Sequence, residues 1–382
     1  MKRHNIFIAI SLAIFSSTLG VGIISPLLPI YAKTLGATGI QLGVIFASFS
    51  VARTISMPMI GKASDRYGRK IFICIGLLVY TLMSVGYVLS ENMLELLIVR
   101  FLQGFANGMI IPIAVAYIGD IAPDGQEGKY MGLFHAFFFG GFGTGPIIGG
   151  IISDAFGMNF AFYLMGGLNL IALFLALLLL PRHEPHQITP QKSYLKMLKE
   201  SSVVKGLFSY RLPTSLARGV FSCFLPIFGG INLGLSSSAI GALISINILL
   251  NSILQVPGGK LADKFSRRKL IVIGIIIDAL CLLIIPLMHS FLELLVVCIL
   301  SSSARAFAIP SAYVLATEEG RKYGMGLSMG ILNMAMSIGM AIGPFVGGWI
   351  ADAVGVKWTF LFAAFTEVIG IGLFAKFTSI RK

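Results

Sequence analysis

The stretch Gly143–Gly150 reads GTGPIIGG and lies inside an otherwise apolar run from Met131 to Ile152. Glycine and proline are the poorest helix formers, so their concentration within such a run needs a reason. The stretch Ala341–Gly348, AIGPFVGG, shows the same pattern in a second apolar run, 198 residues further along the chain. These two matching stretches therefore predict that the chain contains one structural unit in two copies.

The composition indicates a membrane protein. The chain is 56% apolar and 12% charged, whereas soluble domains carry about 25% charged residues. The charges are clustered and leave apolar stretches of about 20 residues, each long enough to cross a bilayer as a helix. No stretch alternates with period two, which argues against a membrane β-barrel. We predict an all-α membrane protein with twelve transmembrane helices near residues 6–31, 39–61, 71–90, 94–118, 130–153, 159–181, 206–232, 237–258, 270–289, 292–316, 326–351 and 357–377.

The basic residues predict the topology. The N-terminal apolar run continues to Tyr31 without a convincing cleavage site, so we expect an uncleaved first helix rather than a signal peptide. Lys and Arg concentrate in alternate loops, which the positive-inside rule assigns to the cytoplasm. Both termini and residues 182–205 are therefore expected on the cytoplasmic side of the cell (inner) membrane. The net charge of +13 is explained by these loops without a nucleic-acid partner.

The sequence lacks the residues that several classes of protein require. The four cysteines fall within predicted helices and show no disulfide or metal-site spacing. The sequence contains neither a Walker A stretch nor a GxSxG elbow. We therefore predict no metal, no cofactor and no enzymatic reaction. A membrane enzyme or a non-transporting receptor is the weakest hypothesis.

The repeat extends along the whole chain. Gly61–Lys70, GKASDRYGRK, matches Gly259–Arg268, GKLADKFSRR, at the same offset. Further matched pairs are Pro112 with Pro310, Asp120 with Glu318, Asp154 with Asp352 and Asn169 with Glu367. We predict two homologous six-helix halves, residues 1–181 and 206–382, joined by a cytoplasmic linker at 182–205 with a short amphipathic helix as one option. Duplicated membrane halves are typical of transporters.

Three motifs resemble those of the major facilitator superfamily, and the resemblance covers the whole chain. GKASDRYGRK looks like the signature G-x-x-x-D-R-x-G-R-K of the loop after helix 2, and Arg100–Gly104, RFLQG, resembles R-x-x-Q-G of helix 4. The helix 5 stretch resembles the antiporter signature G-x8-G-x3-G-P-x2-G-G, which it matches at Gly132, Gly141, Gly145, Pro146, Gly149 and Gly150. The resemblance implies the major facilitator fold, and the helix 5 signature implies proton-coupled export of drugs or metabolites. The same glycine pattern recurs in full in helix 11, so it reports the duplication more than the direction of transport.

The helix 5 glycines have a physical use. Gly141, Gly145 and Gly149 are four residues apart and share one helical face, which lets a second membrane helix approach closely. Pro146 removes one backbone hydrogen bond and favours a bend. A bent, closely packed helix at the junction of two halves can act as a pivot. The alternative is that these residues serve packing alone.

The loop after predicted helix 2 suggests a latch. Asp65 is expected in a cytoplasmic turn, and Asp120 ends helix 4 on the same membrane face, so Arg69 can reach it. In the family, the matching loop residues are thought to latch the cytoplasmic side shut, and the resemblance carries that role to Gly61, Asp65, Arg66, Gly68 and Arg69. The alternative is a loop that serves topology alone, through its positive charge.

Charged residues inside the hydrocarbon are the strongest pointers to function. Each costs about 2.5–3.5 kcal/mol on insertion scales, so it should face a cavity or a partner. Such residues are Arg53, Arg100, Arg218, Arg305, Asp278 and Glu367. In the family, helices 1, 4, 7 and 10 line the central cavity, so we assign Arg100, Arg218 and Arg305 to a substrate cavity. We add Gln103 and Asn333 as further candidates for this cavity. Arginines paired with the two acids or with backbone carbonyls are the alternative, above all for Arg53.

A proton-coupled transporter needs a group that titrates within the membrane. Predicted helix 1 contains no acid, unlike many drug exporters of the family. The candidates are therefore Glu367, Asp278 and His135, although His135 can equally be a packed, neutral side chain. We favour Glu367 because its repeat mate, Asn169, is uncharged.

These observations favour a secondary transporter that exports an amphipathic compound in exchange for protons. The alternative keeps the fold and changes the substrate to an organic anion, a phosphorylated metabolite or an anionic lipid, because four arginines outnumber two buried acids. The expected partners are a small-molecule substrate, protons and the lipid bilayer, and we expect the protein to function as a monomer.

Overall fold

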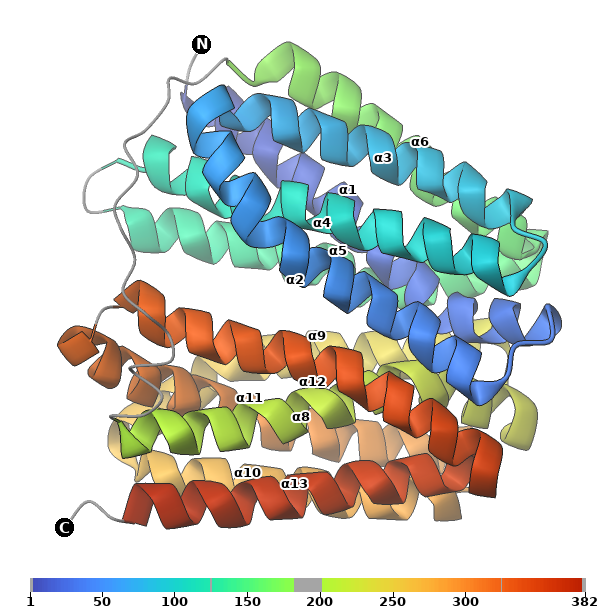
Figure 1. Ribbon diagram of the computed structural model, residues 1–382, viewed down its shortest axis with the longest axis vertical. Coiled ribbons are helices and arrows are strands. Elements are labelled where there is room, and N and C mark those ends of the chain that lie inside the picture. The colour runs from blue at the N-terminus through green and yellow to red at the C-terminus, as the bar shows by residue number, and fades with distance from the viewer. Residues whose placement is uncertain (1–2, 124–125, 182–200, 324, 380–382) are drawn as a thin grey trace. The chain divides into compact units, whose positions relative to one another are not determined.

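The computed structural model describes residues 3–123, 126–181, 201–323 and 325–379, and these segments form helices joined by short turns (Figure 1). Twelve helices among the described residues are long and apolar enough to cross a membrane. They are α1 (Arg3–Thr34), α2 (Gly39–Tyr67), α3 (Arg69–Leu89), α4 (Met93–Ile121), α5 (Glu127–Phe156), α6 (Met158–Leu179), α8 (Ser202–Ile227), α9 (Ser237–Lys264), α10 (Arg267–Ile284), α11 (Phe291–Tyr323), α12 (Met325–Val354) and α13 (Val356–Ser379). A helix satisfies every backbone hydrogen bond internally, which hydrocarbon requires.

The twelve predicted spans are confirmed, and the helices extend beyond several of them. α2 continues to Tyr67 and α9 to Lys264, whereas hydropathy ends these spans near residues 61 and 258. Hydropathy reports where the hydrocarbon ends, but a helix continues into water while its residues favour it. The five-residue π-helical segment Phe228–Asn232 extends α8. The predicted linker helix lies outside the described residues.

The residues form two compact units. Unit 1 contains the chain up to Ala37, the chain from Ser48 to the end of α6, and Leu235–Ser245. Unit 2 contains Thr38–Ala47 together with α8, its π-helical extension and the chain from Ile246 onward. Each unit is thus built mainly from one half of the sequence, with one helix end taken from the other half.

The repeat in sequence is also a repeat in packing. In unit 1, α1 packs against α5 and α6, and α3 packs against α4 and α6. In unit 2, α8 packs against α12 and α13, and α10 packs against α11 and α13. The turns repeat as well: Gly157 joins α5 to α6 with φ 90°, and Gly355 joins α12 to α13 with φ 103°. Both lie in the left-handed region that favours glycine.

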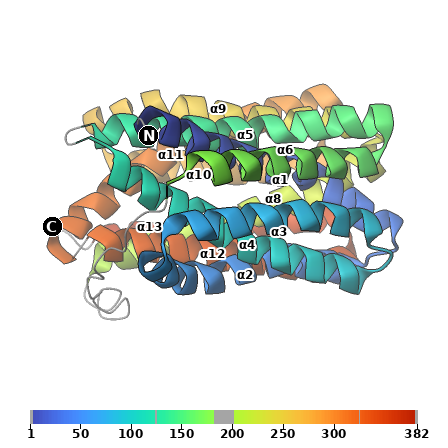
Figure 2. The ribbon, with the colours of Figure 1, turned by 90° about the horizontal axis from the view of Figure 1, so that it is seen from above.

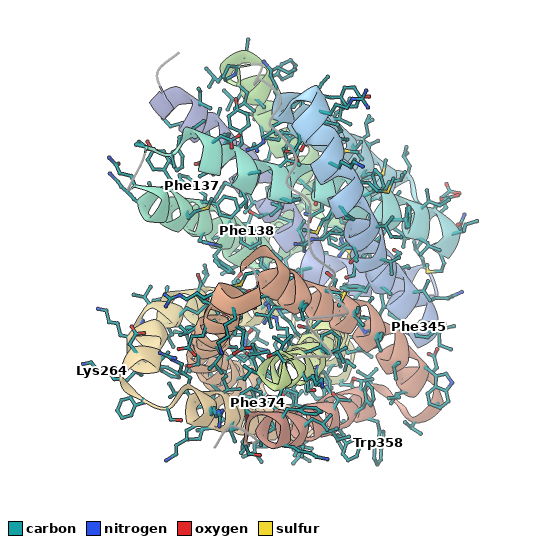
Figure 3. The ribbon with its side chains drawn as sticks, turned by 60° about the vertical axis from the view of Figure 1, so that its left-hand side comes forward. Phe137, Phe138, Lys264, Phe345, Trp358 and Phe374 are labelled. Carbon is teal, nitrogen blue, oxygen red and sulfur yellow. The ribbon has the colours of Figure 1, made fainter. Side chains whose placement is uncertain are left out.

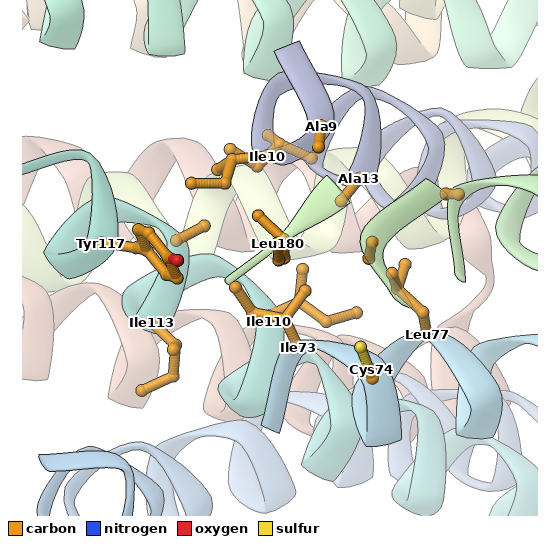
Figure 4. Packing of buried hydrophobic residues seen from close by; sticks show 14 of the residues in the cluster. Ala9, Ile10, Ala13, Ile73, Cys74, Leu77, Ile110, Ile113, Tyr117 and Leu180 are labelled. Carbon is orange, nitrogen blue, oxygen red and sulfur yellow. The ribbon is translucent and has the colours of Figure 1, made fainter. Parts of the chain in front are cut away.

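Apolar side chains fill the interior of each unit and cover its outer surface. In unit 1, Ile10 of α1, Ile73 of α3, Ile110 of α4 and Leu180 belong to one buried cluster (Figure 4). A corresponding cluster in unit 2 includes Phe374. Large side chains such as Phe345 and Trp358 are exposed (Figure 3), as expected of surfaces that face lipid. Within each unit the helices run roughly side by side (Figures 1 and 2).

Candidate functional site

A buried charged cluster lies in unit 2, where α10 packs against α11 and α13. The Asp278 carboxylate accepts a hydrogen bond of 2.6 Å from the Ser301 hydroxyl. Its other oxygen lies 3.6 Å from a guanidinium nitrogen of Arg305. Arg305 also donates a hydrogen bond of 2.8 Å to the side-chain oxygen of Asn247. The side chains of Asp278 and Arg305 are 1% and 13% exposed, so the pair is largely removed from solvent.

Glu367 completes this cluster and is only 1% exposed. It interacts with Asp278 and Arg305, yet neither of its carboxylate oxygens has a hydrogen-bond donor among the described residues. An ionised carboxylate only accepts hydrogen bonds, whereas a protonated one also donates. A single proton on Glu367 or Asp278 would therefore supply the missing donor between the two carboxyl groups.

Two arginines of α8 lie in the same unit. Arg218 is in electrostatic reach of Arg211 and Arg305, and no hydrogen bond or ion pair to its side chain occurs among the described residues. Arg211 contacts the sulfur of Met336 at 3.1 Å and lies 6.0 Å from the ring centre of Tyr313. The sequence analysis missed Arg211. The signal was its spacing of seven residues from Arg218, two helical turns that put both side chains on one face.

The predicted cavity residues of unit 1 are packed inside it. Arg100 is 5% exposed and Gln103 is fully buried. The Gln103 side-chain oxygen accepts hydrogen bonds from Arg100 at 2.8 Å and from the Tyr87 hydroxyl at 2.7 Å. The Arg100 guanidinium lies 4.4 Å from the ring centre of Phe49. The Nε of Arg53 is buried and has no hydrogen-bond partner among the described residues.

Two further candidates are exposed. Asn333 lies on the exposed surface of α12. His135 is exposed on α5 and contacts the rings of Phe134 and Phe139, with centroid distances of 5.2 and 6.1 Å. No contact between Asn333 and the cluster of Asp278 and Glu367 occurs among the described residues of unit 2.

The predicted latch residues meet in unit 1. Arg69 forms an ion pair with Asp120, and a second guanidinium nitrogen lies 3.9 Å from Asp65. The expectation that Asp65 lies in a turn is wrong, because α2 continues through Arg66 to Tyr67. Gly68, with φ 90°, makes the turn instead. Gly61 has open space around it, with no atom within 4 Å of an added Cβ.

The glycines of α5 face two different neighbours. An added Cβ at Gly141, Gly145 or Gly149 would meet backbone atoms of α1 at 2.5–2.8 Å, so this face packs on α1 within unit 1. Gly150 instead lies against the carbonyl oxygen of Ser237, at the start of α9. Gly132 has open space. The backbone N–H of Ile147, directly after Pro146, donates a hydrogen bond of 2.9 Å to the Ser245 hydroxyl.

The described residues contain no group of three or more His, Cys, Asp or Glu side chains that could hold a metal ion. All four cysteines are buried.

Comparison with known proteins identifies the family. The model of the Major Facilitator Superfamily matches residues 10–221 and 207–382. The chain belongs to the major facilitator superfamily. It is thus a multi-pass membrane transporter and not an enzyme.

Two relatives match nearly the whole of this major facilitator, and a third matches about half of it. An uncharacterized MFS-type transporter of Methanocaldococcus jannaschii is 32% identical over 381 residues, which are 97% of each chain. Multidrug resistance protein 2 of Bacillus subtilis is 28% identical over 383 residues, covering 97% of this chain and 95% of the relative. Quinolone resistance protein NorA of Staphylococcus aureus is 34% identical over 176 residues, 46% of this chain and 45% of its own.

Solved structures share the fold at low sequence identity. The crystal structure of a bacterial homolog of the human lysosomal transporter Spinster, in an inward-facing and unoccupied conformation, has a TM-score of 0.87 at 14% identity, covering 99% of this chain and 97% of that one. The nucleoside transporter NupG has a TM-score of 0.82 at 16% identity, covering 99% and 100%. At these identities the likeness establishes the fold alone.

Proposed function

We propose that the protein exports an amphipathic compound across the cell membrane in exchange for protons, by alternating access and as a monomer. Two of the relatives are named for resistance to drugs, one over nearly the whole chain and one over 46% of it. The observation that carries the proton coupling is the cluster of Asp278, Glu367 and Arg305.

The charge balance of the cluster explains how a proton can be used. Two ionised carboxylates and one guanidinium leave these three residues with a net charge of −1 in a largely buried site. Buried charge that is not compensated is costly. One proton neutralises the cluster and supplies the hydrogen bond that Glu367 lacks. A compound with positive charge can compensate the same site, so proton and compound compete.

The first half of the chain indicates that the charges of Asp278, Arg305 and Glu367 are not needed for folding. The positions of Asp278, Arg305 and Glu367 correspond, 198 residues earlier, to Tyr80, Asn107 and Asn169. All three are neutral, and Asn107 donates a hydrogen bond of 2.8 Å to the Tyr80 hydroxyl. The same helix packing therefore exists with neutral groups, which supports a functional reason for the charges in unit 2.

A second candidate substrate is an organic anion, and Arg218 is the observation that favours it. Its guanidinium cannot lose its proton and has no acceptor among the described residues. The acidic group of a transported compound would provide one. Arg211 and Arg305, both in electrostatic reach of Arg218, would add to the attraction.

The two candidates predict opposite effects of pH on binding. A cationic compound that competes with the proton binds more weakly as the pH falls. An anion binds more tightly as the pH falls, because protonation of the carboxyl cluster removes negative charge near the arginines. Binding that weakens as the pH falls corresponds to exchange of the compound with protons. Binding that tightens as the pH falls corresponds to transport of the compound together with protons.

Dansylcholine and dansyltaurine provide a matched test, because they share one fluorophore and carry a permanent positive or negative charge. Their binding to the purified protein is measured over a pH series. Their movement is then measured in proteoliposomes with an imposed pH gradient, against liposomes without protein. Binding of dansylcholine that weakens at low pH, with movement against protons, supports exchange. Movement of neither probe under a pH gradient contradicts proton-coupled transport of charged amphiphiles.

A further inference from the structure

Asp154, in the last turn of α5, caps the start of another helix. Its two carboxylate oxygens accept hydrogen bonds from the backbone N–H groups of Ser237 at 3.1 Å and Ser238 at 2.8 Å. Ser237 is the first residue of α9, and the first amides of a helix have no partner within it. A carboxylate at this end is further stabilised by the helix dipole.

The same arrangement occurs in unit 2. Asp352, in the last turn of α12, accepts hydrogen bonds from the backbone N–H groups of Gly39 at 2.5 Å and Ile40 at 2.8 Å. Gly39 is the first residue of α2. Each of these residues lies 198 positions from its counterpart in unit 1, so the chain contains two equivalent carboxylate caps.

Small residues bring the backbones together beside each cap. An added Cβ at Gly150 would collide with the carbonyl oxygen of Ser237, and one at Gly241 with that of Pro146. Their repeat mates, Gly348 and Gly43, would collide with the carbonyl oxygens of Gly39 and Pro344. The helix starts are thus held by direct backbone contact as well as by the carboxylates.

The capped helices are shared between the two units. The first residues of α9 belong to unit 1 and its remainder, from Ile246, to unit 2. The first residues of α2 belong to unit 2 and its remainder, from Ser48, to unit 1. Any movement of one unit against the other must therefore bend these helices or break the caps.

Each cap lies at the end of its unit opposite that unit's ion pair, Asp154 opposite Arg69–Asp120 and Asp352 opposite Arg267–Glu318. α4 ends beside Asp120, and α5 begins a few residues later and crosses the membrane before it reaches Asp154. Alternating access requires that each face opens while the other is closed. A contact that joins α5 to α9 and α12 to α2 at one face is suited to close that face.

We infer that Asp154 and Asp352 are positioning residues that hold this face closed and set the equilibrium between the two access states. Opening exchanges four N–H···O bonds to carboxylate for bonds to water. The inference needs only that the chain is a transporter and does not depend on the substrate or on protons. By the usual contribution of a helix cap, loss of one carboxylate is expected to raise the open-to-closed ratio about fivefold.

Spin-label distances test this without any substrate. Labels are attached to cysteines introduced at the exposed positions Asn159 and Ile231, while the four native cysteines are buried. Asp154→Ala and Asp352→Ala are each expected to increase the long-distance population about fivefold, and the double variant about 25-fold, because separate sites are additive. Glu293→Ala is the matched control, since Glu293 accepts a bond of 2.7 Å from His289 beside the start of its own helix.

Ser237→Pro removes the donor instead of the acceptor, at a helix position where proline is well tolerated. It is expected to shift the distances in the same direction, and adding Asp154→Ala, which then removes only the Ser238 bond, is expected to shift them less than Asp154→Ala does in the parent. This variant also tests the inference if Asp154→Ala does not accumulate. Distances in the double alanine variant and in Ser237→Pro that match the parent would overturn the inference, as would an equal shift in Glu293→Ala.

Discussion

Asn107 donates a hydrogen bond of 2.8 Å to the hydroxyl of Tyr80, and this neutral pair occupies the positions that Arg305 and Asp278 occupy in the second half. Equivalent positions in the two halves thus hold a neutral hydrogen-bonded pair in one half and an ion pair in the other. The neutral pair satisfies its polar groups locally, as a buried site requires. The charged pair adds a third group, Glu367, whose oxygens have no donor among the described residues.

The neutral pair of Tyr80 and Asn107 predicts how substitutions in the charged cluster change the stability of the protein. Arg305→Gln alone leaves Asp278 buried without its cation and should lower the free energy of unfolding by about 3 kcal/mol. Asp278→Asn added to Arg305→Gln should restore most of that loss, because no uncompensated charge remains. Thermal unfolding of the purified proteins in detergent measures both. Losses that simply add in the double variant would show that the two groups are not coupled.

Substitutions of two latch residues, Asp120 and Asp65, should affect stability and transport to different extents. Asp120→Asn removes the ion-pair partner of Arg69, which is 8% exposed, and should cost about 2 kcal/mol of stability. Asp65 lies 3.9 Å from Arg69 and its side chain is 35% exposed, so Asp65→Asn should cost under about 1 kcal/mol. We expect Asp65→Asn to remain folded and inserted but to transport far more slowly. Normal transport by that variant would mean that the loop serves topology alone.

Topology can be tested independently of activity. Reporter tags at either terminus or within residues 182–205 should report from the cytoplasm, because the basic loops fall on that face. Tags at Gly157 and Gly355, in the turns that follow α5 and α12, should report from outside and serve as controls. An outside signal from either terminus would contradict the predicted orientation.

The helices were predictable from sequence because hydrocarbon imposes a simple rule. A span must be long, apolar and internally hydrogen-bonded, and each of these properties is local. The end of α2 was less predictable, since its last turns, from Lys62 to Tyr67, lie beyond the apolar run. There the decisive residue is Gly68, whose φ of 90° ends the helix.

The site was only partly predictable, because its contacts are not local. The repeat identified Asp154 and Asp352 as equivalent, but their bonds to Ser237 and Gly39 connect segments far apart in sequence. Similarly, the sequence analysis assigned both Arg100 and Arg218 to the substrate cavity because both are charged residues within the membrane. In the structure Arg100 donates a hydrogen bond to Gln103, one turn further along its own helix, and Arg218 has no such partner among the described residues. Sequence reveals which polar groups are costly, and packing decides which of them are satisfied.

This difference predicts that the arginines respond differently to replacement. Arg100→Gln leaves the oxygen of Gln103 without one of its two donors and should reduce thermal stability and accumulation in the membrane. Arg218→Gln removes a charge with no partner among the described residues, so stability should change little. Its effect should appear as an altered preference between dansyltaurine and dansylcholine. Lys269→Gln, at an exposed position near the start of α10, controls for the lost charge.

Glu367 provides the sharpest test of proton coupling. Glu367→Gln keeps the size of the side chain and supplies an N–H donor toward Asp278, so the protein should fold and mimic the protonated state. Substrate binding should persist, but its dependence on pH should flatten, and transport driven by a pH gradient should be lost. Binding over a pH series and flux in proteoliposomes measure the two effects, with Glu293→Gln, at an exposed carboxyl in the first turn of α11, as the matched control. If Glu367→Gln still concentrates substrate against a gradient as well as the parent does, Glu367 is not the proton carrier, and Asp278 becomes the next residue to replace.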